Sequence, residues 1–255
     1  MLLGDRTAVI TGAGSGVGRA SALRFASEGA RVVCADINEQ SLAQTVDLVS
    51  QAGGKATGVR CDVRSEEDVK SAVQAAVSHF GRLDVMFNNA AITGYSEGKL
   101  FEDTTIDDWS RLIDINFRGV FFGCKYAVKR FKDQKGPGVI INTSSIAGMV
   151  GWGNVVYGAT KGGVNQLTRG LAIECAPFDI RVNAICPAAM PHTNFSTTRT
   201  AEERQKMIRD TAAYHPLGRV IMADDCAAAA VFLASDQARN ITGILMPIDG
   251  GYTAR

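Results

Sequence analysis

The sequence has almost no net charge and no long apolar run. Its 27 lysine and arginine residues nearly balance 26 aspartate and glutamate residues, so the formal net charge is +1. This balance gives no broad electrostatic attraction for nucleic acid, an anionic membrane or an acidic partner. No stretch approaches the apolar length that a membrane span requires. We therefore expect no binding to nucleic acid and no membrane association.

Cysteine and histidine are too sparsely placed to form a recognisable metal motif. The six cysteines include no C-x-x-C pair, and the three histidines include no H-x-x-x-H pair. We therefore expect unpaired structural thiols and no metal centre. The first residues also lack the basic segment, apolar segment and cleavage site of a secretion signal. These features predict a cytoplasmic protein in a reducing compartment.

Short apolar runs alternate along the chain with longer helical patterns. Strands are expected at residues 6–12, 31–37, 56–63, 83–90, 138–145, 180–187 and 244–251. Helices are expected at residues 16–30, 39–54, 65–81 and 105–131, after about residue 157, and near the C-terminus. No linker interrupts this series. It predicts one α/β domain over residues 1–255, a doubly wound Rossmann fold whose seven-stranded parallel sheet has helices on both faces.

One long connection departs from this regular alternation. Residues 188–215 follow the sixth expected strand, are rich in threonine and alanine, and have a partly helical pattern. A connection of this length at the carboxyl edge of a parallel sheet is typical of a lid over a binding site. We therefore expect this segment to cover the substrate.

A glycine-rich turn stands between the first strand and the first helix. The sequence TGAGSGVG, residues 11–18, has glycines at positions 12, 16 and 18 that allow a tight turn. Backbone N–H groups of such a turn can approach a pyrophosphate at the helix N-terminus. Glycine also occurs in such turns for packing alone, but the flanking strand and helix favour a dinucleotide site.

The residue at the end of the second strand indicates which dinucleotide binds. Asp36 can accept hydrogen bonds from a ribose 2′-hydroxyl and would repel a 2′-phosphate. Neither Ser15 nor Ile37 supplies a cation that could bind such a phosphate. The alternative is an exposed turn aspartate without a ligand. The position of Asp36 favours NAD over NADP.

Further motifs follow at the expected strand ends and helix starts. They are CDV at 61–63, NNAA at 88–91, IN at 115–116, NTSSIAG at 142–148, YGATK at 157–161, RVNAICP at 181–187 and GILMPIDGG at 243–251. Together with TGAGSGVG, they resemble the motifs of the short-chain dehydrogenases/reductases across nearly the whole chain. The loop and the resemblance together imply cofactor binding by Gly12, Ser15, Gly16, Val17, Gly18, Asp36, Ile37, Asp62, Val63, Asn89, Ala90, Tyr157, Lys161, Pro187, Met190 and Thr193.

The resemblance also implies roles for four residues in the reaction. Tyr157 would move a proton to or from the substrate oxygen. Lys161 would lower the pKa of Tyr157 and would bind the nicotinamide ribose. Ser145 would hydrogen-bond the substrate oxygen, and Asn116 would hold a water that connects Lys161 to solvent. Each also has a structural alternative, in which Tyr157 packs, Lys161 extends to solvent, Ser145 ends a strand and Asn116 is a satisfied helix residue.

Three positions depart from the family's pattern. The usual spacing before the tyrosine selects Ser144, whereas alignment on Gly148 selects Ser145, which we prefer because loops absorb deletions easily. Ala91 and Ala188 replace glycines of the family. The threonine that would contact the carboxamide, Thr193, stands one position late.

These features predict NAD-dependent oxidation of a secondary alcohol or reduction of the matching ketone. A pocket of Ser145, Trp152 and Tyr157, with Thr93, Gly94, Val155 and segment 188–215, would favour a moderately apolar small molecule. The alternatives are a 3-oxoacyl-thioester reductase, which Asp36 disfavours because such enzymes usually prefer NADP, and a non-catalytic dinucleotide-sensing regulator, which would not need the Tyr157–Lys161 pair.

The resemblance further implies a homotetramer, with helices around 107–131 and 157–175 at one interface and the C-terminal strand region at another.

Overall fold

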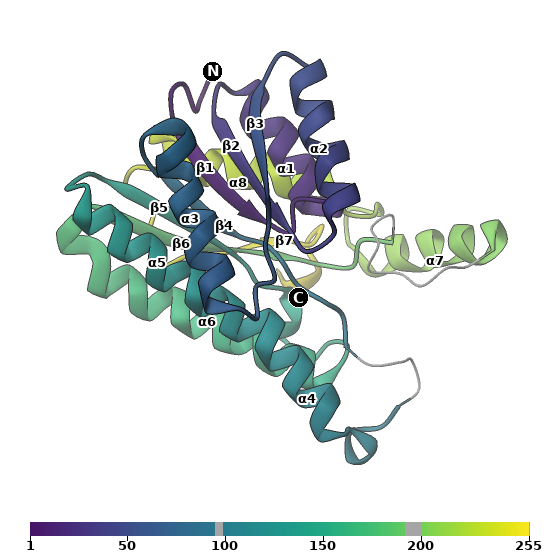
Figure 1. Cartoon of the computed structure of the whole chain (residues 1–255). Helices are drawn as coiled ribbons and strands as arrows, with labels where there is room; N and C mark the ends of the chain where they lie inside the picture. Colours follow the sequence, from purple (N-terminus) through teal and green to yellow (C-terminus); the bar gives the residue numbers. More distant parts are fainter. Residues whose placement is uncertain (95–98, 192–199, 255) are drawn as a thin grey trace.

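A seven-stranded parallel sheet forms the centre of the computed structural model, which describes residues 1–94, 99–191 and 200–254 (Figure 1). The strands are β1 (Thr7–Thr11), β2 (Arg31–Asp36), β3 (Lys55–Arg60), β4 (Val85–Asn88), β5 (Gly138–Thr143), β6 (Ile180–Pro187) and β7 (Leu245–Ile248). Their order is β3-β2-β1-β4-β5-β6-β7, and every neighbouring pair is parallel. The expected α/β fold is confirmed.

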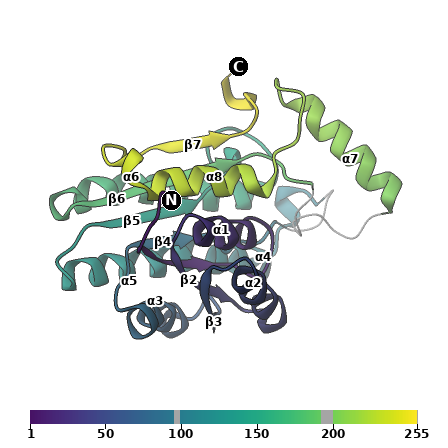
Figure 2. The same cartoon turned by 90° about the horizontal axis from the view of Figure 1, so that it is seen from above.

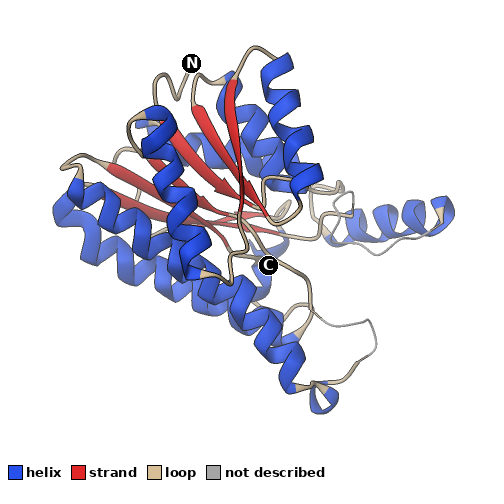
Figure 3. Ribbon diagram, in the orientation of Figure 1, coloured by secondary structure: helices blue, strands red, loops and turns tan. Residues whose placement is uncertain are grey.

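Helices cover both faces of the sheet (Figure 3). One face carries α1 (Gly16–Ser27), α2 (Glu39–Gln51) and α8 (Ala223–Ala234), and the other carries α3 (Glu66–Phe80), α5 (Gly119–Asp133) and α6 (Val155–Cys175). Successive side chains of a strand point to opposite faces of the sheet, so each strand contributes to the core on both faces. In β1, Ala8 and Ile10 pack against the first group of helices, and Val9 packs against the second. This double burial explains why the strands read as continuous apolar runs.

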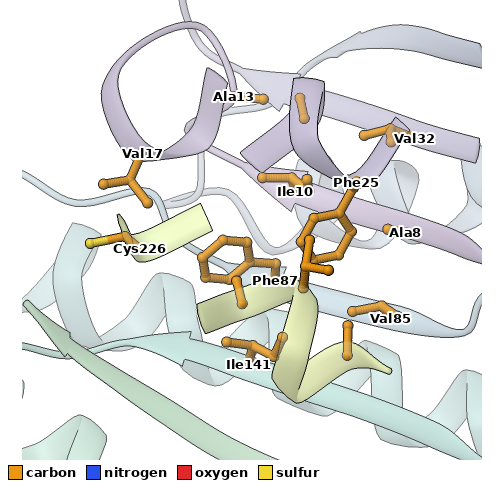
Figure 4. Close-up of a cluster of buried hydrophobic side chains, with 14 of the residues drawn as sticks. Ala8, Ile10, Ala13, Val17, Phe25, Val32, Val85, Phe87, Ile141 and Cys226 are labelled. Atoms are coloured by element: carbon orange, nitrogen blue, oxygen red, sulfur yellow. The ribbon is translucent and has the colours of Figure 1, made fainter. Parts of the chain in front are cut away.

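The core between α1, α8 and the sheet is built from large and small side chains together (Figure 4). Phe25 of α1 stacks on Phe87 of β4, with 6.4 Å between ring centroids and an interplanar angle of 12°. The alanine-rich sequence of α8 lets this helix pack closely against α1, with Cys226 and Ala230 fully buried between them. Close packing here holds α1, and the glycine turn before it, against the sheet.

The expected helix over 105–131 contains an interruption. It consists of α4 (Ile106–Ile113), a π-helical turn over Asp114–Arg118 and α5, which ends at Asp133. A π-turn inserts extra backbone into an α-helix, and such turns are common at functional sites. The apolar pattern predicts the helix but does not reveal this turn, where Asn116 is located.

The long connection after β6 is helical in part. Helix α7 (Ala201–Tyr214) begins with a capping box between Thr200 and Glu203 and lies outside the sheet and its helical layers (Figures 1 and 2). After α7 the chain returns to the body, where His215 is buried and its Nδ1 lies 2.8 Å from the carbonyl oxygen of Arg219. The remainder of the expected lid, residues 192–199, lies outside the described residues.

All six cysteines are buried and free. Burial raises the pKa of each thiol. Within residues 1–94, 99–191 and 200–254, no cluster of three or more cysteine, histidine or acidic side chains could hold a metal ion. None of the helices in the same ranges is long and apolar enough to cross a membrane.

Replacing Phe25 with alanine should lower the free energy of unfolding by about 3–5 kcal/mol, because it removes a buried aromatic ring and leaves a cavity beside Phe87. Chemical denaturation measures this change. Phe101 is 62% exposed, so Phe101→Ala is the matched control and should change stability by less than about 0.5 kcal/mol. Equal effects of the two substitutions would contradict this description of the core.

Candidate active site

The expected site residues converge at the carboxyl edge of the sheet. The chain proceeds from β1 to β2 and β3 on one side, whereas β4 to β7 extend on the other side. In open α/β sheets, ligands bind at the carboxyl ends of the strands where the strand order reverses in this way. Here that point lies between β1 and β4.

The glycine turn lies directly at this reversal point. Gly12 has a φ of +66°, a left-handed conformation that favours glycine, and a Cβ on Gly18 would lie 2.0 Å from the Gly12 carbonyl oxygen. Ser15 stands at the N-cap of α1, and its side chain makes no capping hydrogen bond to any described residue. The first N–H groups of a helix have no partner within it. Those of α1, including the Gly16 and Val17 amides, are therefore available to an anion.

Asp36 closes the turn on the side of β2. Its Oδ2 accepts a hydrogen bond from the Gly14 N–H at 2.8 Å, and its Oδ1 accepts one from the Asn38 N–H at 2.9 Å. Two backbone donors therefore fix the carboxylate beside the glycine turn. The neighbouring Ile37 is 52% exposed and supplies no charge.

The CDV motif follows β3 and approaches the same edge. The Asp62 carboxylate is held by Arg64, whose Nη2 donates to Oδ2 at 2.6 Å, and this hydrogen bond holds the pKa of Asp62 below its usual range. Val63 is buried, and a Cβ on Gly119 of α5 would lie 2.9 Å from it. The Val63 side chain therefore packs against the start of α5.

The NNAA motif joins the ends of β1, β4 and β5. The Thr11 hydroxyl accepts hydrogen bonds from the backbone N–H groups of Asn89 and Ala90, at 3.0 and 3.1 Å. The Asn89 side chain donates to the Thr11 carbonyl oxygen at 3.0 Å and accepts from the Thr143 hydroxyl at 3.2 Å. These bonds hold three strand ends in one row along the site.

The two adjacent serines after β5 point in different directions. The Ser144 hydroxyl donates to the Lys161 carbonyl oxygen at 3.0 Å and is buried under α6. The Ser145 hydroxyl lies 3.3 Å from the Pro187 carbonyl oxygen and accepts from the Ala147 N–H at 3.1 Å, and the same side chain acts to lower the pKa of Tyr157. Ser145, and not Ser144, therefore faces the tyrosine.

Tyr157 and Lys161 lie one turn apart on α6. Asn154 begins this helix by accepting a hydrogen bond from the Tyr157 N–H at 2.9 Å. The Lys161 Nζ lies 5.6 Å from the centroid of the Tyr157 ring and donates to the Thr143 carbonyl oxygen at 2.8 Å. The spacing of four residues brings both polar groups to the same side of α6.

Burial governs the protonation of this pair. It raises the pKa of Tyr157 to about 12, although the Ser145 side chain acts in the opposite direction. It also lowers the pKa of Lys161 to about 8. In the protein alone, burial and not the charge of Lys161 therefore determines the direction of the Tyr157 pKa shift.

Asn116 is fully buried in the π-turn. Its Oδ1 accepts from the Ile92 N–H at 2.8 Å, and its Nδ2 donates to the Ile92 carbonyl oxygen at 2.9 Å. This reciprocal pairing attaches the segment after β4 to the helix that carries Asn116. The side chain is thus paired at both of its polar atoms, as in the structural alternative of a satisfied helix residue.

Pro187, Trp152 and Met190 are the other expected residues that the structure describes. Pro187 ends β6 beside Ser145, and Trp152 and Met190 pack against the edge of the core that contains α8. Thr193 lies outside the described residues. Gly94 contacts the Asn154 side chain, since a Cβ there would lie 2.5 Å from its Cγ. Asn154 was missed in the sequence, although an asparagine three residues before the tyrosine is a recognisable N-cap.

These groups fit a dinucleotide together with a small molecule that carries a reacting oxygen. The glycine turn offers unpaired N–H groups and the fixed Asp36 carboxylate offers acceptors, while Ser145 and Tyr157 present hydroxyls to one spot. A phenol and a serine hydroxyl at one position can exchange a proton with an oxygen bound between them. The arrangement therefore suits proton transfer coupled to a reaction of the dinucleotide.

Comparison with known proteins finds relatives over nearly the full chain. The family described as enoyl-(acyl carrier protein) reductase matches residues 12–253. The 3beta-hydroxysteroid dehydrogenase 1 of Eggerthella lenta is 41% identical over 253 residues, covering 98% of this chain and 95% of that protein. The cyclohexanol dehydrogenase of an Acinetobacter species is 39% identical over 253 residues, covering 98% and 96% respectively.

A solved structure agrees with these sequence relatives. The crystal structure of a short-chain type dehydrogenase/reductase from Mycobacterium marinum superimposes with a TM-score of 0.90, at 31% identity, over 99% of this chain and 97% of that one. Sequence and fold thus point to the same group of proteins. The chain belongs to the short-chain dehydrogenases/reductases, an oxidoreductase family that uses nicotinamide dinucleotide cofactors.

Proposed function

We propose that this protein is an NAD-dependent oxidoreductase that interconverts a secondary alcohol and its ketone. The observation that carries this proposal is the placement of Tyr157 beside both Ser145 and Lys161, next to a glycine turn closed by Asp36. The relatives named as dehydrogenases of a hydroxysteroid and of cyclohexanol support a secondary alcohol as the substrate class.

In this proposal, Tyr157 exchanges the proton of the substrate oxygen and Ser145 orients that oxygen. A nicotinamide cofactor bound beside these residues would supply the hydride acceptor for oxidation of the alcohol and the hydride donor for reduction of the ketone. Ser145 is well suited to its task, because the Ala147 N–H and the Pro187 carbonyl fix its hydroxyl from behind. Tyr157 accepts the hydroxyl proton during oxidation and donates it during reduction.

Lys161 assists Tyr157 by its charge. Its ammonium group, held by the Thr143 carbonyl, lies close enough to stabilise a phenolate electrostatically. We further propose that it binds the ribose of the nicotinamide half and passes protons to solvent through a water held at Asn116. The side-chain atoms of Asn116 are already paired with Ile92, so the backbone of the π-turn is the site we propose for this water.

The substrate in this proposal is a moderately apolar small molecule. Trp152 and Met190 are partly buried and pack against the core cluster that includes Ala188. Such a surface favours a ring or hydrocarbon next to the reacting carbon over a strongly charged group. Thr93, Gly94 and Val155 complete the proposed pocket, with segment 188–215 as its cover.

We also infer a cytoplasmic homotetramer. Apolar side chains remain exposed on the helices expected at one interface, including Phe121 of α5 at 45% and Ile173 of α6 at 79%. Association would remove them from water. Light scattering should report about four times the mass of one chain, and a value for one chain would contradict this inference.

The Tyr157→Phe variant should lose about 10²–10⁴-fold in kcat, because it lacks the proton-exchanging hydroxyl. The measurement is NADH formation with a panel of cyclic and aromatic secondary alcohols, together with NADH oxidation by 3-oxoacyl thioesters. Tyr126→Phe, which removes only a hydroxyl bonded to Glu66, is the matched control and should keep full activity. Binding of NAD without turnover of any substrate by the unaltered chain would instead favour a regulator, and preference for the thioesters would favour their reductase.

The Lys161→Met variant should shift the rise of alcohol oxidation to higher pH. Oxidation requires a tyrosine able to accept a proton, so its rate rises as pH approaches the tyrosine pKa, and loss of the ammonium raises that pKa further. Since the pKa of Lys161 is lowered to about 8 in the protein alone, the deficit should be largest below that pH. Lys70→Met, which removes a surface ion pair with Glu67, serves as control. An unchanged pH–rate profile would remove Lys161 from the mechanism.

The unaltered protein should prefer NAD to NADP, because Asp36 repels a 2′-phosphate. Asp36→Ser should raise the kcat/KM ratio of NADP to NAD at least about tenfold, equivalent to about 1.4 kcal/mol. The exposed Asp47, on the outer side of α2, provides the control Asp47→Ser. A preference of the unaltered protein for NADP would contradict the assignment of the cofactor.

A further inference from the structure

The carbonyl groups of the glycine turn are bound from behind by two side chains. The Thr45 hydroxyl of α2 lies 2.9 Å from the Ala13 carbonyl oxygen, and Arg19 of α1 donates to the Gly14 carbonyl oxygen through Nη2. Thr45 is fully buried and Arg19 is half-buried. The two side chains also bind each other, since Arg19 Nε donates to the Thr45 hydroxyl at 3.0 Å.

The same two turn residues are bound through their N–H groups as well. The Ala13 N–H donates to the Ala35 carbonyl at 3.1 Å, and the Gly14 N–H donates to Asp36 at 2.8 Å. Ala13 and Gly14 are therefore fixed at both their donor and their acceptor groups. Neither peptide unit can rotate without breaking a hydrogen bond to a buried or half-buried partner.

This fixation determines which groups face an anion at the start of α1. A rotated peptide unit in the turn would direct a carbonyl oxygen, with its partial negative charge, toward the phosphates. With the Gly14 carbonyl bound to Arg19, the Ser15 N–H of the same trans peptide unit points away from Arg19. The turn is thus ordered before any ligand binds, which lowers the entropy cost of binding.

Arg19 contributes its charge as well as its hydrogen bonds. Its partners are all neutral, namely the Gly14 and Ser41 carbonyls, the Gln44 side chain and the Thr45 hydroxyl. No described carboxylate forms a salt bridge with it within 4.0 Å. Its positive charge is therefore not cancelled by an ion pair and adds to the attraction for phosphate at the turn.

We propose that Arg19 and Thr45 are positioning residues for the dinucleotide phosphates: they hold the carbonyls of Ala13 and Gly14 away from the pyrophosphate and keep the turn's N–H groups directed at it. This inference rests on the proposed binding of NAD. It assigns to the contact between α1 and α2 a task in cofactor affinity in addition to packing.

The test uses Thr45→Val, which keeps the shape of the side chain but removes the hydroxyl, and Arg19→Met, which keeps its length but removes the fork and the charge. Calorimetry measures the Kd of NAD and of ADP-ribose, which retains the pyrophosphate. Inhibition by adenosine, which has no phosphate, is measured in parallel. Arg24→Met, on an exposed position of α1, is the matched control.

Thr45→Val and Arg19→Met should each raise the Kd of NAD and of ADP-ribose about tenfold or more. The kcat at saturating NAD should stay within about twofold of that of the unaltered protein, and inhibition by adenosine should be nearly unchanged. Thr45→Ser should restore the affinity, because it returns the hydroxyl. A general loss of packing would instead weaken the binding of adenosine as much as the binding of NAD and ADP-ribose.

Three results would overturn the proposal. They are unchanged Kd values for NAD in both variants, equal weakening of adenosine and ADP-ribose, and failure of Thr45→Ser to restore binding. If Thr45→Val does not fold, Arg19→Met decides alone, because its side chain is half-exposed. If the unaltered protein binds neither NAD nor ADP-ribose, the proposed function fails first, and this inference fails with it.

Discussion

The hydrogen bonds between Thr11 and the Asn89–Ala90 backbone are the contact on which the site depends. They connect β1 and β4, the two strands between which the sheet reverses its order. On one side of this connection lies the glycine turn with Asp36, and on the other lie Thr143, Ser145 and the α6 pair. Because Asn89 also binds Thr143, the two halves are held in one frame and cannot separate without exposing the sheet core.

Much of this frame could be predicted from the sequence, because period and composition determine it directly. Buried parallel strands require unbroken apolar runs, and the glycine turn requires residues without side chains. The π-turn over Asp114–Arg118 could not be predicted in this way, since one extra backbone residue leaves the apolar pattern of the helix nearly unchanged. The choice between Ser144 and Ser145 was equally beyond a spacing argument. It depends on which hydroxyl the turn after β5 directs toward Tyr157 and which it directs toward the Lys161 carbonyl.

The direction of the tyrosine pKa shift illustrates another limit. Charge proximity along one helix suggests that Lys161 lowers the pKa of Tyr157, whereas burial, which no short motif encodes, raises it. Arg19 and Thr45 were missed for a similar reason, because their partners are backbone carbonyls contributed by a distant turn. The substrate is the least predictable part, since it depends on connecting segments that vary in length and sequence within one fold.

The six buried thiols have a consequence for how the folded protein meets its chemical surroundings. The thiolate is the reactive form of cysteine, and burial both hides these sulfurs and suppresses their ionisation. Alkylating or oxidising reagents therefore reach them only when the surrounding structure opens. Because the cysteines are spread over strands β2 and β6, helices α5, α6 and α8 and the turn after β3, the rate at which each sulfur is labelled reports the opening of its own layer. The chain thus carries internal reporters of local unfolding in both halves of the core.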